Sequence, residues 1–309
     1  MREVALTREL VRPGGLWSEV RVVEQTGSTN ADVVALARAG AAEGLVLVAD
    51  RQDAGRGRMG RSWHAPAGTG LTMSVLLRPS GVEAARFGWL PLLAGVAVVR
   101  ACASYPRIDA ALKWPNDLLV RPAVGEHGGA ADEAVAWGKC GGILAEAVDA
   151  ETVVVGIGVN VSQRASQLPP PSDPLAYPAT SLARAGARPG RERLAVIMLR
   201  GLDHWYGRWV AASGDPDASG LRAAYLSHCA TLGQPVTATL PGRGTLRGTA
   251  EAVDPDGRLV VATATGEHRL AAGDVHHLRP GRAAGAMASR AGGPSDPPVQ
   301  GRVPLAPAH

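Results

Sequence analysis

The sequence has few cysteines and no long apolar run at its start. Its three cysteines, Cys102, Cys140 and Cys229, are an odd number without the spacing of metal ligands, so a disulfide framework or a zinc site is not expected. The longest apolar run, from Phe87 to Val99, is interrupted by glycine and proline and is too short to span a bilayer. We therefore expect a soluble, cytoplasmic protein without a membrane partner.

A large excess of charge is also missing. The net charge of +4 over 309 residues, with a pI near 9.3, permits anionic partners but does not require nucleic acid. Aromatic residues make up only 4% of the chain, with a single Phe, but hydrophobic residues in total make up 46%, as in ordinary globular proteins. The length allows two domains and a sizeable core.

What the sequence does contain is a glycine- and arginine-rich loop, QDAGRGRMGRSWHAPAGTG, over residues 52–70. Glycines let the backbone fold close around a ligand, and guanidinium groups form paired hydrogen bonds with phosphate or carboxylate. Three glycines and three arginines stand together in its first half: Gly55, Arg56, Gly57, Arg58, Gly60 and Arg61. We interpret it as an anion-binding loop, with an ordinary solvated basic loop as the alternative.

The run GRGRMG also matches the dinucleotide-binding pattern G-x-G-x-x-G. That pattern requires a strand before it and a helix after it. Here the strand-like run LTMSVLLRP follows from Leu71. A Rossmann site is therefore disfavoured.

Polar motifs stand at the ends of several predicted strands. The alternating run from Glu19 leads into STN at residues 28–30, which either caps a short helix or binds a ligand. A buried strand from Leu45 leads to Gln52. The run ALKWPNDLLV predicts a strand broken by a turn at Pro115, which presents Lys113, Asn116 and Asp117 to a ligand or forms a plain edge turn.

Two later runs, KCGGILAEAVD and TVVVGIGVNV, predict strands that pair as a hairpin. Glycine weakens a strand unless something must approach the backbone closely. The glycines within these runs are Gly141, Gly142, Gly156 and Gly158. They indicate either a ligand that lies across the sheet or a pair of β-bulges.

The remaining segments set the domain organisation. Residues 1–18 show no strong periodicity, and residues 85–104 predict a helix that is kinked or broken near Pro91. Residues 121–138 have the composition of a surface insertion. Helical periodicity follows from residue 191, with a second helix possible over residues 220–230. Short strands with turn signals over residues 234–280 predict a small β-barrel.

Five runs occur in the order, and near the spacing, found in the biotin protein ligases. They are STN from Ser28, QDAGRGRMGRSW from Gln52, KWPND from Lys113, KCGGILAE from Lys139 and GIGVN from Gly156. On these runs the sequence resembles that family over roughly residues 19–280. It resembles the form without an N-terminal DNA-binding domain, since about eighteen residues before the first predicted strand are too few for a helix-turn-helix motif.

The resemblance implies an α/β fold, with a central mixed-sheet catalytic domain over residues 19–232 and an SH3-like β-barrel over residues 233–280. Residues 1–18 would form an N-terminal extension and residues 281–309 a disordered tail. The implied reaction joins biotin and MgATP into biotinyl-5′-adenylate, which then acylates one lysine of a biotin carboxyl carrier domain of an acyl-CoA carboxylase. ATP, biotin and Mg²⁺ are the implied cofactors. The protein would be a monomer or homodimer that binds no DNA.

The resemblance also implies roles for individual residues. The biotin-binding residues would be Ser28, Thr29, Asn30, Gln52, Gly55, Arg56, Gly57, Gly142, Gly156 and Gly158. The nucleotide-binding residues would be Arg61, Trp63, Asn116 and Asn160, with Trp63 either covering the adenine or simply packing. The catalytic residues would be Arg58, Lys139, Lys113 and Asp117. Lys139 would contact both the biotin carboxylate and the α-phosphate, whereas Asp117 would orient the acceptor amine or help to hold metal.

The sequence departs from the family pattern in two places. The insertion at residues 121–138 is longer than usual, and Cys140 replaces an aliphatic residue, so we expect a buried cysteine without a catalytic role. A lipoate or octanoate ligase, which shares the fold, is the nearest alternative function. A nucleic-acid-binding regulator is a further, disfavoured alternative.

Overall fold

The computed structural model describes residues 1–123, 137–171, 173–240, 244–271 and 273–278. Most of the predicted insertion and all of the predicted tail lie outside the described residues. The division of the chain between residues 232 and 233 stays a prediction.

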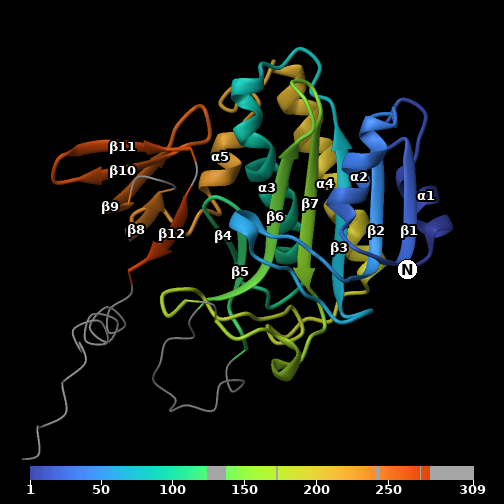
Figure 1. Ribbon diagram of the computed structural model, residues 1–309, viewed down its shortest axis with the longest axis horizontal. Helices are drawn as coiled ribbons and strands as arrows, with labels where there is room; N and C mark the ends of the chain where they lie inside the picture. Colours follow the sequence, from blue (N-terminus) through green and yellow to red (C-terminus); the bar gives the residue numbers. More distant parts are fainter. Residues whose placement is uncertain (124–136, 172, 241–243, 272, 279–309) are drawn as a thin grey trace, which may run out of the picture.

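A seven-stranded mixed sheet forms the centre of the larger part of the chain (Figure 1). Only the first two strands of the sheet are parallel, and all other neighbours are antiparallel. In spatial order the strands are β1 (Glu19–Thr26), β2 (Leu45–Gln52), β3 (Gly70–Leu77), β7 (Val153–Asn160), β6 (Gly138–Ala147), β5 (Asp117–Val120) and β4 (Ala110–Lys113). The predicted α/β mixed-sheet fold is confirmed.

The two faces of this sheet differ in what covers them. The long helices α3 (Trp89–Ala103) and α4 (Arg191–Ala211) pack on one face, where alternate β-branched side chains such as Val75 and Val155 form the main core. Helix α2 (Thr29–Arg38) packs on the other face over a second, smaller apolar cluster that contains Leu76 and Val154. Further along the same strands this second face carries polar residues and glycines. A site can therefore form there without disturbing the core.

Helix α1 (Glu3–Leu10) was not expected from the sequence. It packs against β1 and α4 through Leu6 and Leu10, which are buried, and Trp17 follows it into the core, with its indole donating to the carbonyl of Leu199. Two buried leucines one turn apart are too few to produce a periodic pattern. The sequence therefore predicts only an N-terminal extension over residues 1–18, without this helix.

The predicted helix over residues 85–104 consists of a 3₁₀ segment, η2 (Ala84–Gly88), followed by α3. Pro91 lies in the first turn of α3, where its missing N–H removes no intrahelical bond. The stretch Ala84–Ala103 is longer than the apolar run identified in the sequence, and by length and composition alone it could cross a membrane. Because 67% of it is buried inside the protein, it behaves as a core helix.

The C-terminal part is an antiparallel sheet that lies beside the β4–β6 end of the large sheet (Figure 1). Short helix α5 (Leu221–Leu226) precedes it. In spatial order its strands are β11 (Gly266–Leu270), β10 (Leu259–Thr263), β9 (Gly244–Val253), β8 (Pro235–Leu240) and β12 (Asp274–His277). Two core tryptophans connect it to the larger domain: Trp89 donates to the carbonyl of Pro255, and Trp114 to that of Gly257. The predicted small all-β domain is confirmed.

Candidate active site

A cavity of about 490 Å³ lies on the second face of the large sheet, beyond α2. It is lined by every predicted site residue except Gly55, so segments far apart in the sequence meet at one place. These residues are Ser28, Thr29, Asn30, Gln52, Arg56, Gly57, Arg58, Arg61, Trp63, Lys113, Asn116, Asp117, Lys139, Gly142, Gly156, Gly158 and Asn160.

Glycines on β6 and β7 form the floor of the cavity. A Cβ on Gly158 would lie 2.6 Å from Trp63, and one on Gly156 would lie 2.1 Å from Asn30 Oδ1, so only glycine fits beneath these side chains. Gly142 has more space, with no atom nearer than 3.8 Å. The pairing of β6 with β7 is regular, so bulges do not explain these three glycines; the register shift of β6 lies instead against β5.

One end of the cavity holds a buried polar cluster around the STN run. The backbone N–H and the hydroxyl of Thr29 both donate to Gln52 Oε1, at 2.8 and 2.9 Å. Ser74 Oγ lies 2.7 Å from Thr29 Oγ1 and 2.6 Å from Asn30 Oδ1. The amide of Asn30 donates to Glu146 Oε2 at 2.6 Å. Neither Ser74 nor Glu146 was assigned a role from the sequence.

Ser28 occupies the N-cap position of α2, but its side chain makes no capping hydrogen bond. Its hydroxyl lines the cavity, although the residue is only 5% exposed. Capping alone therefore does not account for this serine, and its hydroxyl is available to a ligand.

Near the middle of the cavity, two lysines hold one carboxylate. Lys139 Nζ lies 2.6 Å from Asp117 Oδ1, and Lys113 Nζ lies 3.5 Å from Asp117 Oδ2. Lys113 and Asp117 face each other as the last and first residues of β4 and β5, so the predicted strand break at Pro115 forms a tight turn. These are the only two lysines in the sequence.

Burial disfavours the charged form of both Lys113 and Asp117, but the net result differs between them. It lowers the pKa of Lys113, and the nearby Asp117 only partly offsets this effect. Burial also opposes the ionisation of Asp117, but the attraction of Lys139 and Lys113 outweighs it and keeps the pKa of Asp117 below its usual value. Asp117 is therefore a carboxylate that neutralises one of the two positive charges and leaves the other for an anionic ligand.

The arginine loop closes on itself beside these lysines. Trp63 N donates to the carbonyl of Gly55, and Gly57 N donates to that of Arg61. A Cβ on Gly55 would lie 2.4 Å from the carbonyl oxygen of Trp63. Gly55 thus makes the loop closure possible and is not among the residues that line the cavity, so its assignment as a ligand contact stays a prediction.

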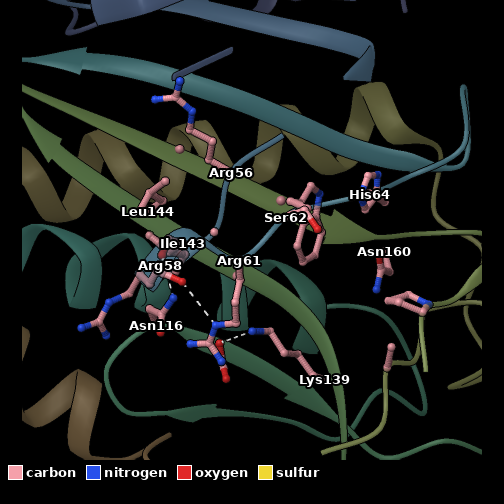
Figure 2. A pocket seen from close by; sticks show the side chains of 18 of the residues that line it. Arg56, Arg58, Arg61, Ser62, His64, Asn116, Lys139, Ile143, Leu144 and Asn160 are labelled. Atoms are coloured by element: carbon pink, nitrogen blue, oxygen red, sulfur yellow. Dashed lines mark hydrogen bonds and ion pairs between the residues drawn. The ribbon is translucent and has the colours of Figure 1, made fainter. Parts of the chain in front are cut away.

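The three arginines of the loop point in different directions (Figure 2). Arg61 extends toward Lys139 and pairs with Asp274 at 3.3 and 3.4 Å. Arg58 extends past Asn116, and its burial lowers its pKa, an effect that Asp117 partly offsets. Arg56 points away from the lysine cluster. The loop therefore supplies cations to more than one part of a ligand.

Two of the predicted nucleotide-binding residues, Asn160 and Asn116, already have hydrogen-bond partners in the fold. Asn160 donates to the carbonyl of Thr180 and accepts from Gln163, and Asn116 donates to the carbonyl of Ile143. The ring of Trp63 lies over the glycine floor, and its buried Nε1 has no hydrogen-bond partner among the described residues. Its indole N–H is a donor that a bound ligand can satisfy.

The C-terminal domain and a proline-rich segment complete the wall. The principal additions are Asp274, His276, Pro169, Pro170, Pro171 and Tyr177. A hydrogen bond from His276 holds the pKa of Asp274 well below its usual value, and Arg61 adds to this effect against the influence of burial. No motif identified these residues, because the sequence pattern around Asp274 indicates only a turn.

Within the described residues, no three His, Cys, Asp or Glu side chains come together as a metal site. Asp117 and Asp274, the carboxylates in the cavity, are both paired with cations. These residues fit a magnesium ion that arrives on the phosphates of its nucleotide better than one held by the protein. Cys140 is fully buried, and burial raises the pKa of its thiol well above the usual value, in agreement with its expected role as a small core residue.

Comparisons with known proteins identify the family of this chain. Residues 22–160 match the biotin/lipoate A/B protein ligase family, and residues 231–278 match the biotin protein ligase C-terminal domain. A biotin–[acetyl-CoA-carboxylase] ligase of Mycobacterium tuberculosis is 39% identical over 282 residues, which are 90% of this chain and 96% of that protein. The chain belongs to the biotin protein ligase family.

Other members of the biotin protein ligase family are more distant. The bifunctional ligase/repressor BirA of Bacillus spizizenii is 33% identical over 80% of this chain and 70% of its own length. The structure of the biotin protein ligase from Aquifex aeolicus, in complex with biotin and ATP, aligns with 85% of this chain and all of its own, at 26% identity and a TM-score of 0.66. The predicted family and fold are confirmed.

Proposed function

We propose that this protein activates biotin with MgATP to biotinyl-5′-adenylate and transfers the biotinyl group to a lysine of a biotin carboxyl carrier domain. The observation that carries the proposal is the arrangement of the cavity, in which a buried polar cluster and a cluster of cations lie at either end of a glycine floor. This arrangement suits a ligand with a polar ring, an aliphatic tail and a terminal carboxylate. The Mycobacterium tuberculosis relative bears the name of that activity.

The polar cluster would bind the ureido ring of biotin. Thr29, Asn30 and Gln52 supply donors and acceptors in a buried setting, and the free hydroxyl of Ser28 adds another. Arg56 and Gly57 would cover the ring from the loop, and Gly142 would lie beneath the tail. Gly156 and Gly158 would leave room for Asn30 and Trp63, whose side chains lie on them beside the ligand. A dithiolane ring or a plain alkyl end would leave these buried polar groups unpaired, which costs about 1–3 kcal/mol for each group. Biotin is therefore favoured over lipoate and octanoate.

In the first step a carboxylate oxygen of biotin attacks the α-phosphorus of ATP. A new oxygen–phosphorus bond forms, the bond to the β-phosphate oxygen breaks, and pyrophosphate leaves with that electron pair. Because two anions approach each other, cations must stabilise the charge of the transition state. Lys139 and Arg58 would contact the attacking carboxylate and the α-phosphate, and Lys113 would reach the outer phosphates.

The nucleotide would occupy the rest of the cavity. Arg61, Trp63, Asn116 and Asn160 would contact it, with the indole N–H of Trp63 donating to a ligand acceptor. Magnesium would enter as part of the substrate, bound to the phosphates. Enclosure of the adenylate in the cavity would protect this mixed anhydride from hydrolysis by water.

In the second step the uncharged amine of the acceptor lysine attacks the acyl carbon of the adenylate. A carbon–nitrogen bond forms, the bond from the acyl carbon to the phosphate oxygen breaks, AMP leaves with that electron pair, and the amine's proton passes to water. Asp117 is paired with two lysines and has a lowered pKa, so it is a poor acceptor of the amine's proton. Its proposed role is to position Lys113 and Lys139. We further propose a cytoplasmic monomer or homodimer whose partner is a carrier domain of an acyl-CoA carboxylase.

Exchange of labelled pyrophosphate into ATP, measured with biotin, lipoate and octanoate in turn, tests this function. Exchange that depends on biotin, followed by biotin transfer to an apo carrier domain, is expected. Exchange with lipoate or octanoate in place of biotin would show the alternative ligase. Folded protein that exchanges with none of the three acids would overturn the assignment.

A further inference from the structure

A buried histidine of the C-terminal domain connects the two segments that carry the active-site lysines. His277 is the last residue of β12 and is 3% exposed. Its Nδ1 lies 2.9 Å from the hydroxyl of Tyr177, and its Nε2 lies 3.1 Å from Oγ1 of Thr231. The two ring nitrogens thus contact separate segments of the larger domain.

The contact with Tyr177 leads to Lys139. The ring of Tyr177 stands edge-on to that of His277, with centroids 5.6 Å apart. The next residue, Pro178, accepts a hydrogen bond of 2.8 Å from the backbone N–H of Lys139, and Thr180 N donates to the Lys139 carbonyl at 2.9 Å. The segment with Tyr177 therefore fixes the backbone of Lys139 through two hydrogen bonds.

The contact with Thr231 leads to Lys113. The hydroxyl oxygen of Thr231 accepts a hydrogen bond of 2.9 Å from the backbone N–H of Trp114, the residue that follows Lys113. Thr231 and Trp114 are both buried. The contact with Thr231 therefore fixes the start of the turn that presents Lys113 and Asp117.

The two lysines come from different strands, β4 and β6, which are joined by β5 with a register shift on the β6 side, and their side chains share the carboxylate of Asp117. Their separation depends on how the two backbone segments sit relative to each other, and His277 contacts a neighbour of each. An imidazole suits this position because its two nitrogens are held at a fixed separation in one rigid ring.

We propose that His277 is a positioning residue, which sets the spacing of Lys113 and Lys139 for the attack of biotin on the α-phosphate. This role rests on the proposed function. His277 acts through Tyr177 and Thr231 and does not itself line the cavity. The C-terminal domain thereby contributes to the geometry of a site most of which lies in the other domain.

The test measures adenylate formation in a single turnover at saturating biotin and MgATP, together with the affinity for biotin alone by calorimetry. In His277→Ala the rate should fall by about tenfold, a change of about 1.4 kcal/mol in the barrier. Biotin affinity should fall less than the rate does, because Thr29 and Gln52 do not contact His277 and the variant keeps the Lys139 side chain. A merely structural role would lower both together with the melting temperature.

Two variants with smaller side-chain changes test the two contacts of His277 separately. Tyr177→Phe removes only a hydroxyl and keeps the ring, and Thr231→Val removes the other hydrogen-bond partner with little change in shape. Tyr177→Phe should slow adenylation by about threefold, consistent with the loss of one hydrogen bond. Thr231→Val should slow it by more than Tyr177→Phe does, because it also leaves the buried backbone N–H of Trp114 without its acceptor. In the His277→Ala background, Tyr177→Phe should have a smaller effect than in the wild type, because one partner of its hydroxyl is already absent. His268→Ala, on β11 of the same domain, is the matched control and should keep the wild-type rate.

The outcomes separate the two proposals. Wild-type protein that forms no adenylate from biotin overturns the proposed function and with it this role. An active wild type with an equally active His277→Ala variant overturns only the positioning role. So does an effect of Tyr177→Phe that is the same in both backgrounds, or a loss of biotin affinity as large as the loss of rate.

Discussion

The side-chain oxygen of Asn30 lies over the backbone of Gly156, at 2.1 Å from the point that a Cβ would occupy. Asn30 cannot move aside cheaply, because its amide also donates to the carbonyl of Leu144 and to Glu146, and its oxygen contacts Ser74. Helix α2 and strand β7 can therefore approach this closely only with a glycine at position 156.

Substitution of Gly156 by alanine should disrupt biotin binding. The new methyl group would displace Asn30 and with it the polar cluster at the end of the cavity. We expect the dissociation constant for biotin, measured by calorimetry, to rise by at least about tenfold, or about 1.4 kcal/mol. Gly207→Ala in α4 is the control, because a Cβ there meets nothing within 4 Å. Equal affinity in the two variants would show that Asn30 does not organise the biotin end.

Replacement of Arg58 by alanine should release the adenylate more than it affects the fold. Arg58 lies in a loop beside the lysine cluster, and loop substitutions usually change the free energy of unfolding by less than about 0.5 kcal/mol. The measurements are the appearance of free biotinyl-adenylate in the absence of acceptor and the melting temperature. Unchanged release, or a large fall in melting temperature without release, would contradict the role of Arg58.

The two lysines should differ in what their loss changes. Lys139→Ala should lower both the rate of adenylation and the affinity for biotin, by about tenfold or more, because a hydrogen bond to a charged group is worth about 1.5–3 kcal/mol. Lys113→Ala should mainly raise the KM for ATP. Because Lys113 is 7% exposed, its loss should also lower the free energy of unfolding more than the loss of Lys139 does.

Calorimetry without nucleotide provides the decisive comparison for Lys139. Biotin affinity equal to that of the wild type would contradict its contact with the biotin carboxylate. Denaturant unfolding of both variants then tests the difference in stability, and equal losses would contradict the structural part of the prediction.

Removal of the carboxylate of Asp274 should change how stability depends on pH. Its pKa is well below the usual value in the folded protein, first because of His276 and then because of Arg61. A lowered carboxyl pKa stabilises the fold above the unfolded value of about 4, and that stabilisation is lost as the pH falls toward the folded pKa. The free energy of unfolding should therefore fall more steeply below about pH 4 in the wild type than in Asp274→Asn. Parallel curves from denaturant titrations would contradict this prediction.

Much of the fold and the site could be predicted because the relevant signals are local. The apolar runs of β2, β3 and β7 predicted strands, and Gly142, Gly156 and Gly158 stood out because glycine is unusual in such runs. The break at Pro115 correctly placed Lys113 and Asp117 at a turn. Helix α1 was missed because Leu6 and Leu10 are its only buried residues.

Other site residues depend on contacts between distant segments. Asp274 and His276 reach the cavity only through the docking of the C-terminal domain, which no local pattern encodes. Tyr177 comes from the proline-rich segment before α4. Glu146 could have been found, since strand alternation places it on the same face as Gly142. Gly55 was assigned to the ligand because the sequence cannot distinguish a glycine that approaches a ligand from one that closes a loop.

The location of Lys113 and Lys139 also bears on self-modification. A released acyl-adenylate acylates uncharged amines. The only lysine side chains of this sequence are Lys113 and Lys139, and both are held in ion pairs with Asp117. The amino group of Met1 is likewise engaged, at 3.0 Å from Asp50. The enzyme should therefore keep its original mass through many turnovers without acceptor, even while a lysine-rich bystander protein in the same tube acquires biotin.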